Sequence, residues 1–227
     1  SIPNKAGIEF YHKIFDELLK YKIVPIVTLS HYEIPLGLVH KYNGFYSKCT
    51  VDFFMNYVKT CLIEYKDKVK YWIVFNEING IEYSGWLNAG VSSNNSSILA
   101  ITAKNMLVAN AKTVALAHEI NPSNLVGAMV GYALSYPYTC NPEDSFAQIK
   151  HQQEIEFYLD VMARGKYPEY KLKEYERKGI SVNLDSKEKA LLESGTVDFI
   201  SFSYYMSNCV SSDVTIKPNQ EGNLVRG

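Results

Sequence analysis

The chain has 227 residues, 47% of them hydrophobic, and its formal net charge at pH 7 is -1. This composition is typical of a globular protein and excludes a disordered or fibrous chain. Because 23 basic residues are balanced by 24 acidic ones, the chain has no broad positive field. We therefore expect neither nucleic acid nor a membrane surface as a partner.

The sequence shows no motif for a metal ion, a nucleotide cofactor or a targeting signal. The four cysteines, at positions 49, 61, 140 and 209, have no C-x-x-C spacing, so we expect reduced thiols and no metal site. No glycine-rich phosphate loop follows an apolar run, so we expect no cofactor. The first residues do not resemble a signal peptide, and no apolar run reaches about 18 residues. We therefore expect a cytoplasmic location.

Two kinds of periodic segment alternate along the chain. Apolar spacing of three and four residues predicts helices over residues 6–20, 50–65, 98–118 and 145–164. Short runs rich in β-branched residues predict strands over residues 23–30, 71–75, 125–131 and 197–203. The charged stretch 166–189 indicates a solvated helix face, and the polar stretch 79–97 is longer than an ordinary connection.

Alternating helices and strands predict parallel βα units in an α/β protein. Four such units fit either an open doubly wound sheet or part of a (β/α)8 TIM barrel. The absence of a nucleotide-binding motif favours the barrel. Since no linker divides the sequence, we predict one domain, an incomplete barrel segment over residues 1–227.

Polar or aromatic residues follow several of the predicted strands. Glu77 comes directly after strand 71–75, His31 and Tyr32 follow the first strand, and Tyr205 follows the last. In a barrel these positions lie at the carboxyl ends of the strands, where active sites form. A carboxyl group there is a candidate proton donor, because burial disfavours its charged form. The alternative for each residue is ordinary packing or exposure at a strand end.

Six segments of the chain, in order, resemble glycoside hydrolase family 1 and, within it, the 6-phospho-β-glucosidase branch. The segments are T-L-S-H-Y-E-I-P (28–35), Y-W-I-V-F-N-E-I-N (71–79), H-E-I-N-P (118–122), Y-P-Y-T-C-N-P (136–142), R-G-K-Y-P (164–168) and D-F-I-S-F-S-Y-Y-M-S (198–207). Ile78 and Ser203 depart from the common N-E-P and N-Y-Y forms of the family, and both departures resemble the phospho-glycosidase branch.

The resemblance implies a (β/α)8 barrel of which this chain matches approximately strands 3 to 6 with their helices. It also implies a retaining β-glycosidase that hydrolyses 6-phospho-β-glucosides in carbohydrate catabolism. The E-N-G segment of the seventh strand, which carries the nucleophile in the family, has no match here. Residues 221–223 read E-G-N, in the wrong order to replace it. The chain would therefore supply only the acid/base half of the site.

The same resemblance implies roles for five residues. Glu77 matches the general acid/base, and Asn76 matches the neighbour that hydrogen-bonds the sugar 2-hydroxyl group. His31 matches a histidine that contacts the sugar, and Tyr205 a tyrosine that orients the nucleophile. Tyr32 stands at a substrate-binding position where many members have tryptophan.

Two other interpretations stay open at this point. The chain could be a non-catalytic half-barrel fragment, or the partner of a separately encoded C-terminal half, because an open sheet has edges available for association. It could also belong to another barrel glycosidase family, although the T-L-S-H-Y-E and S-Y-Y-M-S segments disfavour this. The expected partners are a phosphorylated β-glucoside substrate and, if encoded separately, the missing half of the barrel.

Overall fold

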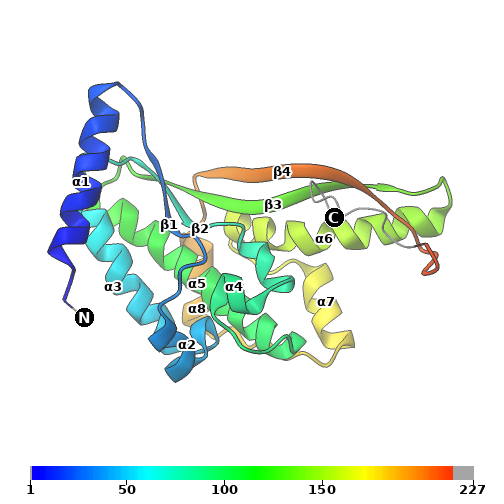
Figure 1. The fold of residues 1–227 in the computed structure, drawn as a ribbon. Helices are drawn as coiled ribbons and strands as arrows, with labels where there is room; N and C mark the ends of the chain where they lie inside the picture. The colour runs from blue at the N-terminus through cyan, green and yellow to red at the C-terminus, as the bar shows by residue number, and fades with distance from the viewer. Residues whose placement is uncertain (1, 217–227) are drawn as a thin grey trace.

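The computed structural model describes residues 2–216, so residues 221–223 lie outside the described part of the chain. The elements alternate in the order that the sequence predicts (Figure 1). They are α1 (Lys5–Lys20), β1 (Ile26–Ser30), α2 (Leu36–Tyr42), η1 (Gly44–Tyr46), α3 (Lys48–Glu64), β2 (Tyr71–Phe75), η2 (Ile78–Glu82), α4 (Gly85–Ala89), α5 (Ser96–Ile120), β3 (Leu125–Pro137), α6 (Pro142–Arg164), α7 (Glu169–Arg177), α8 (Ser186–Ser194) and β4 (Phe199–Val210).

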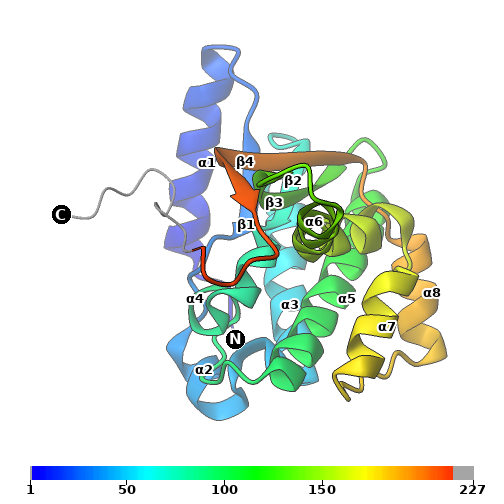
Figure 2. The same cartoon turned by 90° about the vertical axis from the view of Figure 1, so that its right-hand side faces the viewer.

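The four strands form one parallel sheet in the order β1-β2-β3-β4. Each strand therefore lies beside the strand that precedes it in the sequence. Figures 1 and 2 show α1 at the β1 end of the sheet, α6 along β3 and β4, and α3, α5 and α6 on the same side of the strands. A doubly wound sheet would reverse its strand order and carry helices on both faces. Sequential order with one covered face is the geometry of a (β/α)8 barrel, as predicted.

The core lies between the sheet and the helices. Trp72 and Val74 of β2 and Val126 and Val130 of β3 are fully buried, and they share one apolar cluster with α5. Helix α5 is buried around most of its circumference, which explains why its apolar pattern reads as nearly continuous. This core fixes β2 and β3 relative to each other and so fixes the positions of the loops at their carboxyl ends.

Local sequence signals set where several helices begin and end. The side chain of Asn141 caps α6, whose first residue is Pro142, and the helix ends at Gly165 in the left-handed conformation. Asp185 and Glu188 form a reciprocal capping box at the start of α8. Such caps satisfy backbone N–H groups that a helix leaves without partners in its first turn.

The predicted helices and strands are confirmed, with differences at their ends. Strand β1 begins one residue after Pro25, because proline has no N–H group to donate to a sheet. Helix α2 was not predicted, and the polar stretch 79–97 contains η2 and α4 rather than an irregular loop. Within the described residues, none of the helices combines the length and apolar character needed to cross a lipid bilayer.

Strands β3 and β4 run well beyond the ends of β1 and β2. They pair with each other from Gly127 with Phe199 to Pro137 with Val210, and together they form the long ribbon above α6 in Figure 1. The pairing shifts after Tyr132 and Tyr204, so that one residue of β3 opposes two of β4, Tyr205 and Met206. A bulge of this kind bends a strand and redirects its side chains. The bulge contains Tyr205, the tyrosine of β4 that the sequence predicts to lie in the site.

Candidate active site

The carboxyl group of Glu77 is held between two tyrosine hydroxyl groups from different strands. The Tyr32 hydroxyl, after β1, donates to Glu77 Oε2 at 3.0 Å. The Tyr205 hydroxyl, in β4, donates to Glu77 Oε1 at 2.8 Å. Glu77 itself follows β2 and is half-buried, less enclosed than a carboxyl group inside the core. The fold therefore brings three of the five predicted residues into direct contact at the carboxyl ends of the strands.

Asn76 completes this hydrogen-bonded chain. Its side-chain Nδ2 donates to the Tyr32 hydroxyl at 2.8 Å, while its backbone N–H continues the pairing with β1 by donating to Ser30 O at 2.9 Å. Burial of the Tyr32 hydroxyl, followed by its hydrogen bond to Glu77, raises the pKa of Tyr32 to about 12. The phenol is thus a protonated donor toward Glu77 throughout the physiological pH range.

His31 lies next to this group without contacting Glu77. Its backbone N–H donates to both carboxyl oxygens of Glu33 at 2.8 Å, and its ring packs edge-on against the ring of Tyr32, with centroids 5.0 Å apart. The residue is exposed. Its imidazole therefore lies at the rim of the site, where a bound ligand could contact it.

The backbone of the site is in an unfavourable conformation. Tyr32 has φ 75° and Glu77 has φ 41°, two of only four non-glycine residues in residues 2–216 with a positive φ angle of this kind. Such left-handed conformations typically cost on the order of 1–3 kcal/mol each and persist where the surroundings impose them. At Glu77, the carbonyl oxygen accepts hydrogen bonds from Gly80 N at 2.7 Å and from Asn88 Nδ2 at 3.3 Å. These contacts hold the turn that presents the carboxyl group.

The sequence analysis missed two further residues, one that supports the site and one that holds the ends of β3 and β4. Asn79 is buried and pairs with the backbone of Gly131 in β3. Its position in the N-E-I-N segment was the available signal, since a second asparagine close after a buried strand is likewise a strand-end polar residue. The other is Asp144, at the start of α6, which nothing in its local sequence connects with the end of β4.

Asp144 fastens together the far ends of β3 and β4. Its Oδ2 accepts from the backbone and hydroxyl of Thr139, at 3.1 and 2.6 Å. Its Oδ1 accepts from the hydroxyl of Ser211 at 3.2 Å and from the backbone and hydroxyl of Ser212 at 2.7 and 2.8 Å. These hydrogen bonds hold the pKa of Asp144 well below its usual range. The hydrogen bonds from the Thr139 hydroxyl and the Ser212 backbone make the largest contributions.

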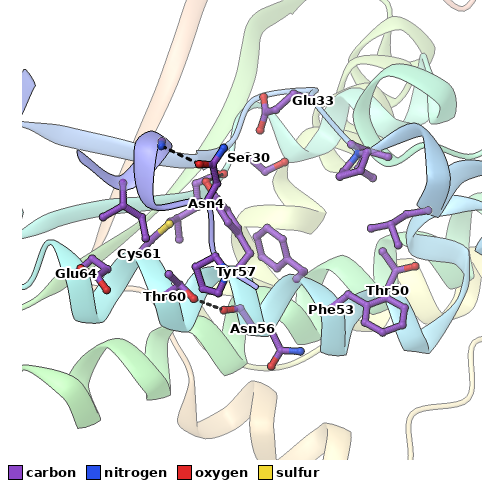
Figure 3. A pocket seen from close by; sticks show the side chains of 18 of the residues that line it. Asn4, Ser30, Glu33, Thr50, Phe53, Asn56, Tyr57, Thr60, Cys61 and Glu64 are labelled. Carbon is purple, nitrogen blue, oxygen red and sulfur yellow. Dashed lines mark hydrogen bonds between the residues drawn. The ribbon is translucent and has the colours of Figure 1, made fainter. Parts of the chain in front are cut away.

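A separate groove of about 900 Å3 lies beside β1, between α1, α2 and α3. Figure 3 shows side chains of α3, among them Phe53, Tyr57 and Cys61, along this groove together with Asn4 and Ser30. Glu77 and Tyr205 do not line it. The groove is mostly apolar and does not open at the carboxyl group that two tyrosine hydroxyls hold, so we assign the chemistry to the Glu77 group instead.

Strands in sequential parallel order, covered by helices on one face and carrying an acid at their carboxyl ends, define half of a (β/α)8 barrel with a candidate active site at its catalytic end. The model of the family "Glycosyl hydrolase family 1" matches residues 1–224, and the chain belongs to this family. The chain is also similar to the solved family 1 β-glucosidase from Thermotoga maritima, with a TM-score of 0.80 and 27% identity, over 91% of this chain and 46% of that one.

Curated relatives point to one branch of the family. The chain is 44% identical to the aryl-phospho-β-D-glucosidase BglA of Bacillus subtilis, over 99% of this chain and 48% of the relative. It is 43% identical to a 6-phospho-β-glucosidase of Clostridium longisporum, over 100% of this chain and 48% of the relative. The chain thus spans about half the length of the curated relatives it matches.

Proposed function

We propose that the protein containing this chain is a retaining β-glycosidase that hydrolyses 6-phospho-β-glucosides, and that Glu77 is its general acid/base. The observation that carries the proposal is the carboxyl group of Glu77, held by Tyr32 and Tyr205 at the carboxyl ends of the strands. Two curated relatives, which share 44% and 43% identity, are named as phospho-β-glucosidases, and this supports the substrate class.

Retaining hydrolysis uses two carboxyl groups about 5–5.5 Å apart, a nucleophile that attacks the anomeric carbon and an acid that protonates the leaving oxygen. In the proposal Glu77 supplies the proton, and it then removes a proton from the water that hydrolyses the glycosyl–enzyme intermediate. The nucleophile comes from the part of the barrel that this chain does not span. In the proposal Asn76 hydrogen-bonds the sugar 2-hydroxyl group, His31 contacts the sugar, and Tyr32 lies at a substrate-binding position. Tyr205 orients the nucleophile.

The test compares wild-type protein with Glu77→Gln in the complete barrel, using two phosphorylated β-glucosides that differ in their leaving groups. An alkyl glucoside needs protonation, so we expect its turnover to fall by about 10²–10⁴-fold. The dinitrophenolate group of a dinitrophenyl glucoside leaves without being protonated, so the glycosylation step of this substrate should be nearly unchanged. Equal losses of kcat/KM, which reports the glycosylation step, with both substrates would remove Glu77 from this role. Equal rates with and without the 6-phosphate would contradict the proposed substrate class.

A second observation supports the alternative that the chain works as one half of an assembled barrel. Ile200, Phe202 and Tyr204, which alternate along the edge strand β4, are each more than half exposed. An apolar stripe on a sheet edge is a surface suited to association. Mixing the chain with a second segment that carries the E-N-G strand should then restore hydrolysis and give a one-to-one complex in size-exclusion chromatography. Separate elution without activity would contradict this alternative.

We also propose that the protein acts in the cytoplasm. All four cysteines, which lie within the described residues, are free thiols, and this state is typical of a reducing compartment. Fractionation of cells that express the natural gene, followed by detection with an antibody against the chain, would test the location. Recovery from the extracellular fraction would contradict it.

A further inference from the structure

Asn79 uses its side chain to continue the sheet beyond the end of β2. Its Nδ2 donates to the carbonyl oxygen of Gly131 at 2.8 Å, and its Oδ1 accepts from the N–H of the same glycine at 2.9 Å. Strand β2 ends at Phe75, and its last residue paired with β3 is Ile73, opposite Gly127. The amide of Asn79 therefore satisfies both backbone groups of Gly131, as a residue of a neighbouring strand would do.

This contact is adjacent to the carboxyl group of Glu77. A Cβ atom at residue 131 would lie 3.3 Å from Cδ of Glu77 and 3.5 Å from its Oε2, so the acid rests directly against the backbone that Asn79 holds. Between β2 and Asn79, Glu77 adopts its left-handed conformation, and Ile78 is 1% exposed. The turn is thus fixed at its start by β2 and at its end by the amide of Asn79.

We propose that Asn79 is a positioning residue for the general acid/base, because its two hydrogen bonds to Gly131 hold the turn and the surface on which the Glu77 carboxyl group lies. This inference rests on the proposed function. Asn79 itself does not touch the substrate, since its side chain is buried and both of its polar atoms are used by Gly131.

The chemistry of the contact requires an amide. Only asparagine combines one donor and one acceptor at this side-chain length. Aspartate would leave the Gly131 carbonyl without a donor and would add a negative charge close to Glu77. Alanine would leave both backbone groups without a protein partner, and unpaired buried groups are costly.

The test is Asn79→Ala in the complete barrel, with Asn105→Ala as a matched control. Asn105 is also buried and also donates to backbone carbonyls, those of Phe45 and Tyr46, but it has no contact with Glu77. We expect both variants to lower the unfolding midpoint. Only Asn79→Ala should lower the ratio of kcat/KM for the alkyl glucoside to kcat/KM for the dinitrophenyl glucoside, on the order of ten- to a hundredfold, because kcat/KM reports the glycosylation step in which Glu77 gives up its proton. The same ratio in both variants would overturn the inference.

Two further measurements keep the inference testable. If Asn79→Ala does not fold, Asn79→Ser retains one polar partner for Gly131 and should give an intermediate ratio; a wild-type ratio would overturn the inference. If the wild-type protein hydrolyses neither glucoside, the proposed function fails, and the inference is decided by the crystal structure of the variant. We expect the Glu77 carboxyl group to leave the hydroxyls of Tyr32 and Tyr205, and unchanged contacts would overturn the inference.

Discussion

The hydroxyl group of Tyr205 donates to Oε1 of Glu77 at 2.8 Å, across 128 positions of sequence. The two residues come from β4 and from the turn after β2, with β3 between these strands. Their contact is possible because β4, together with β3, continues past the end of β2 and bends at the bulge that contains Tyr205. The position of the Glu77 carboxyl group, after β2, therefore depends on β4, which is not adjacent to β2 in the sheet.

Replacing Tyr205 by phenylalanine should weaken catalysis without weakening the fold. The side chain is 55% exposed, so its loss removes little packing. An intramolecular hydrogen bond is typically worth about 0.5–1.5 kcal/mol, so we expect kcat in the complete barrel to fall roughly two- to tenfold. Tyr204→Phe is the matched control, because Tyr204 is equally exposed and its hydroxyl contacts Ser207 instead. Equal rates in the two variants would contradict the role of Tyr205.

The raised pKa of Tyr32 predicts a loss of stability in alkaline solution. The value is about 12 in the folded protein and about 10 in an unfolded chain, so the folded state binds the proton more tightly. This contribution is complete below about pH 10 and is lost as the pH rises toward about 12. In urea titrations over this range, Tyr32→Phe should lose less stability than the wild type, whereas Tyr138→Phe, at an exposed residue, should follow the wild type. Parallel curves for Tyr32→Phe and wild type would exclude this linkage.

Adding a methyl group at Gly131 should displace the acid. The new Cβ would lie 3.3 Å from Cδ of Glu77, which is tighter than ordinary van der Waals contact. We expect Gly131→Ala to reduce turnover of the alkyl glucoside on the order of tenfold or more, with a small change in unfolding midpoint. Gly37→Ala is the control, because a Cβ there meets no atom within 4 Å, and alanine favours helix α2. Full activity of Gly131→Ala would show that the carboxyl group is not confined at this surface.

The lowered pKa of Asp144 predicts a loss of stability in acid. An aspartate in an unfolded chain has a pKa near 3.9, and the folded value lies below it. The contribution is therefore present above about pH 4 and is lost as the pH falls through the folded value. Asp144→Asn should unfold at a lower temperature at neutral pH and lose less stability on acidification. Glu143→Gln removes a charge from the same helix turn but not the bonds to Thr139 and Ser212, and its acid profile should match the wild type. An unchanged midpoint of thermal unfolding in Asp144→Asn would show that Asp144 does not stabilise the ends of β3 and β4.

The parts of the fold that the sequence predicted are those encoded by local periodicity. Helix α1 and strand β2 have bounds within one residue of the prediction, because their apolar spacing is regular. The extensions of β3 and β4 were not predicted. In β4, Ser207 and Asn208 interrupt the apolar residues, and the segment is stabilised as a strand by pairing with β3. Isolated propensity does not contain that information.

In the candidate site, too, the residues that a local sequence pattern marks were predicted, and those that depend on distant pairing were missed. Glu77 and Tyr32 were identified because polar residues directly follow apolar strands, and Asn76 was identified by the resemblance to the family. The structure brings the three residues into one hydrogen-bonded group. Their catalytic roles stay predictions. Asn79 and Asp144 were missed because their partners, Gly131 and Ser212, are 52 and 68 positions away. Such contacts depend on strand register, which no local pattern specifies.

The left-handed backbone at positions 32 and 77 has a consequence for engineering of this protein. Glycine or asparagine at either position would relax the chain, so a library selected only for resistance to heat should accumulate these residues there. Such variants would gain stability, but a substitution at position 32 would remove the phenol and one at position 77 the carboxyl group. In this molecule, substitutions that relieve backbone strain and stabilise the fold fall on the same two residues that are proposed to bind the substrate and to transfer the proton.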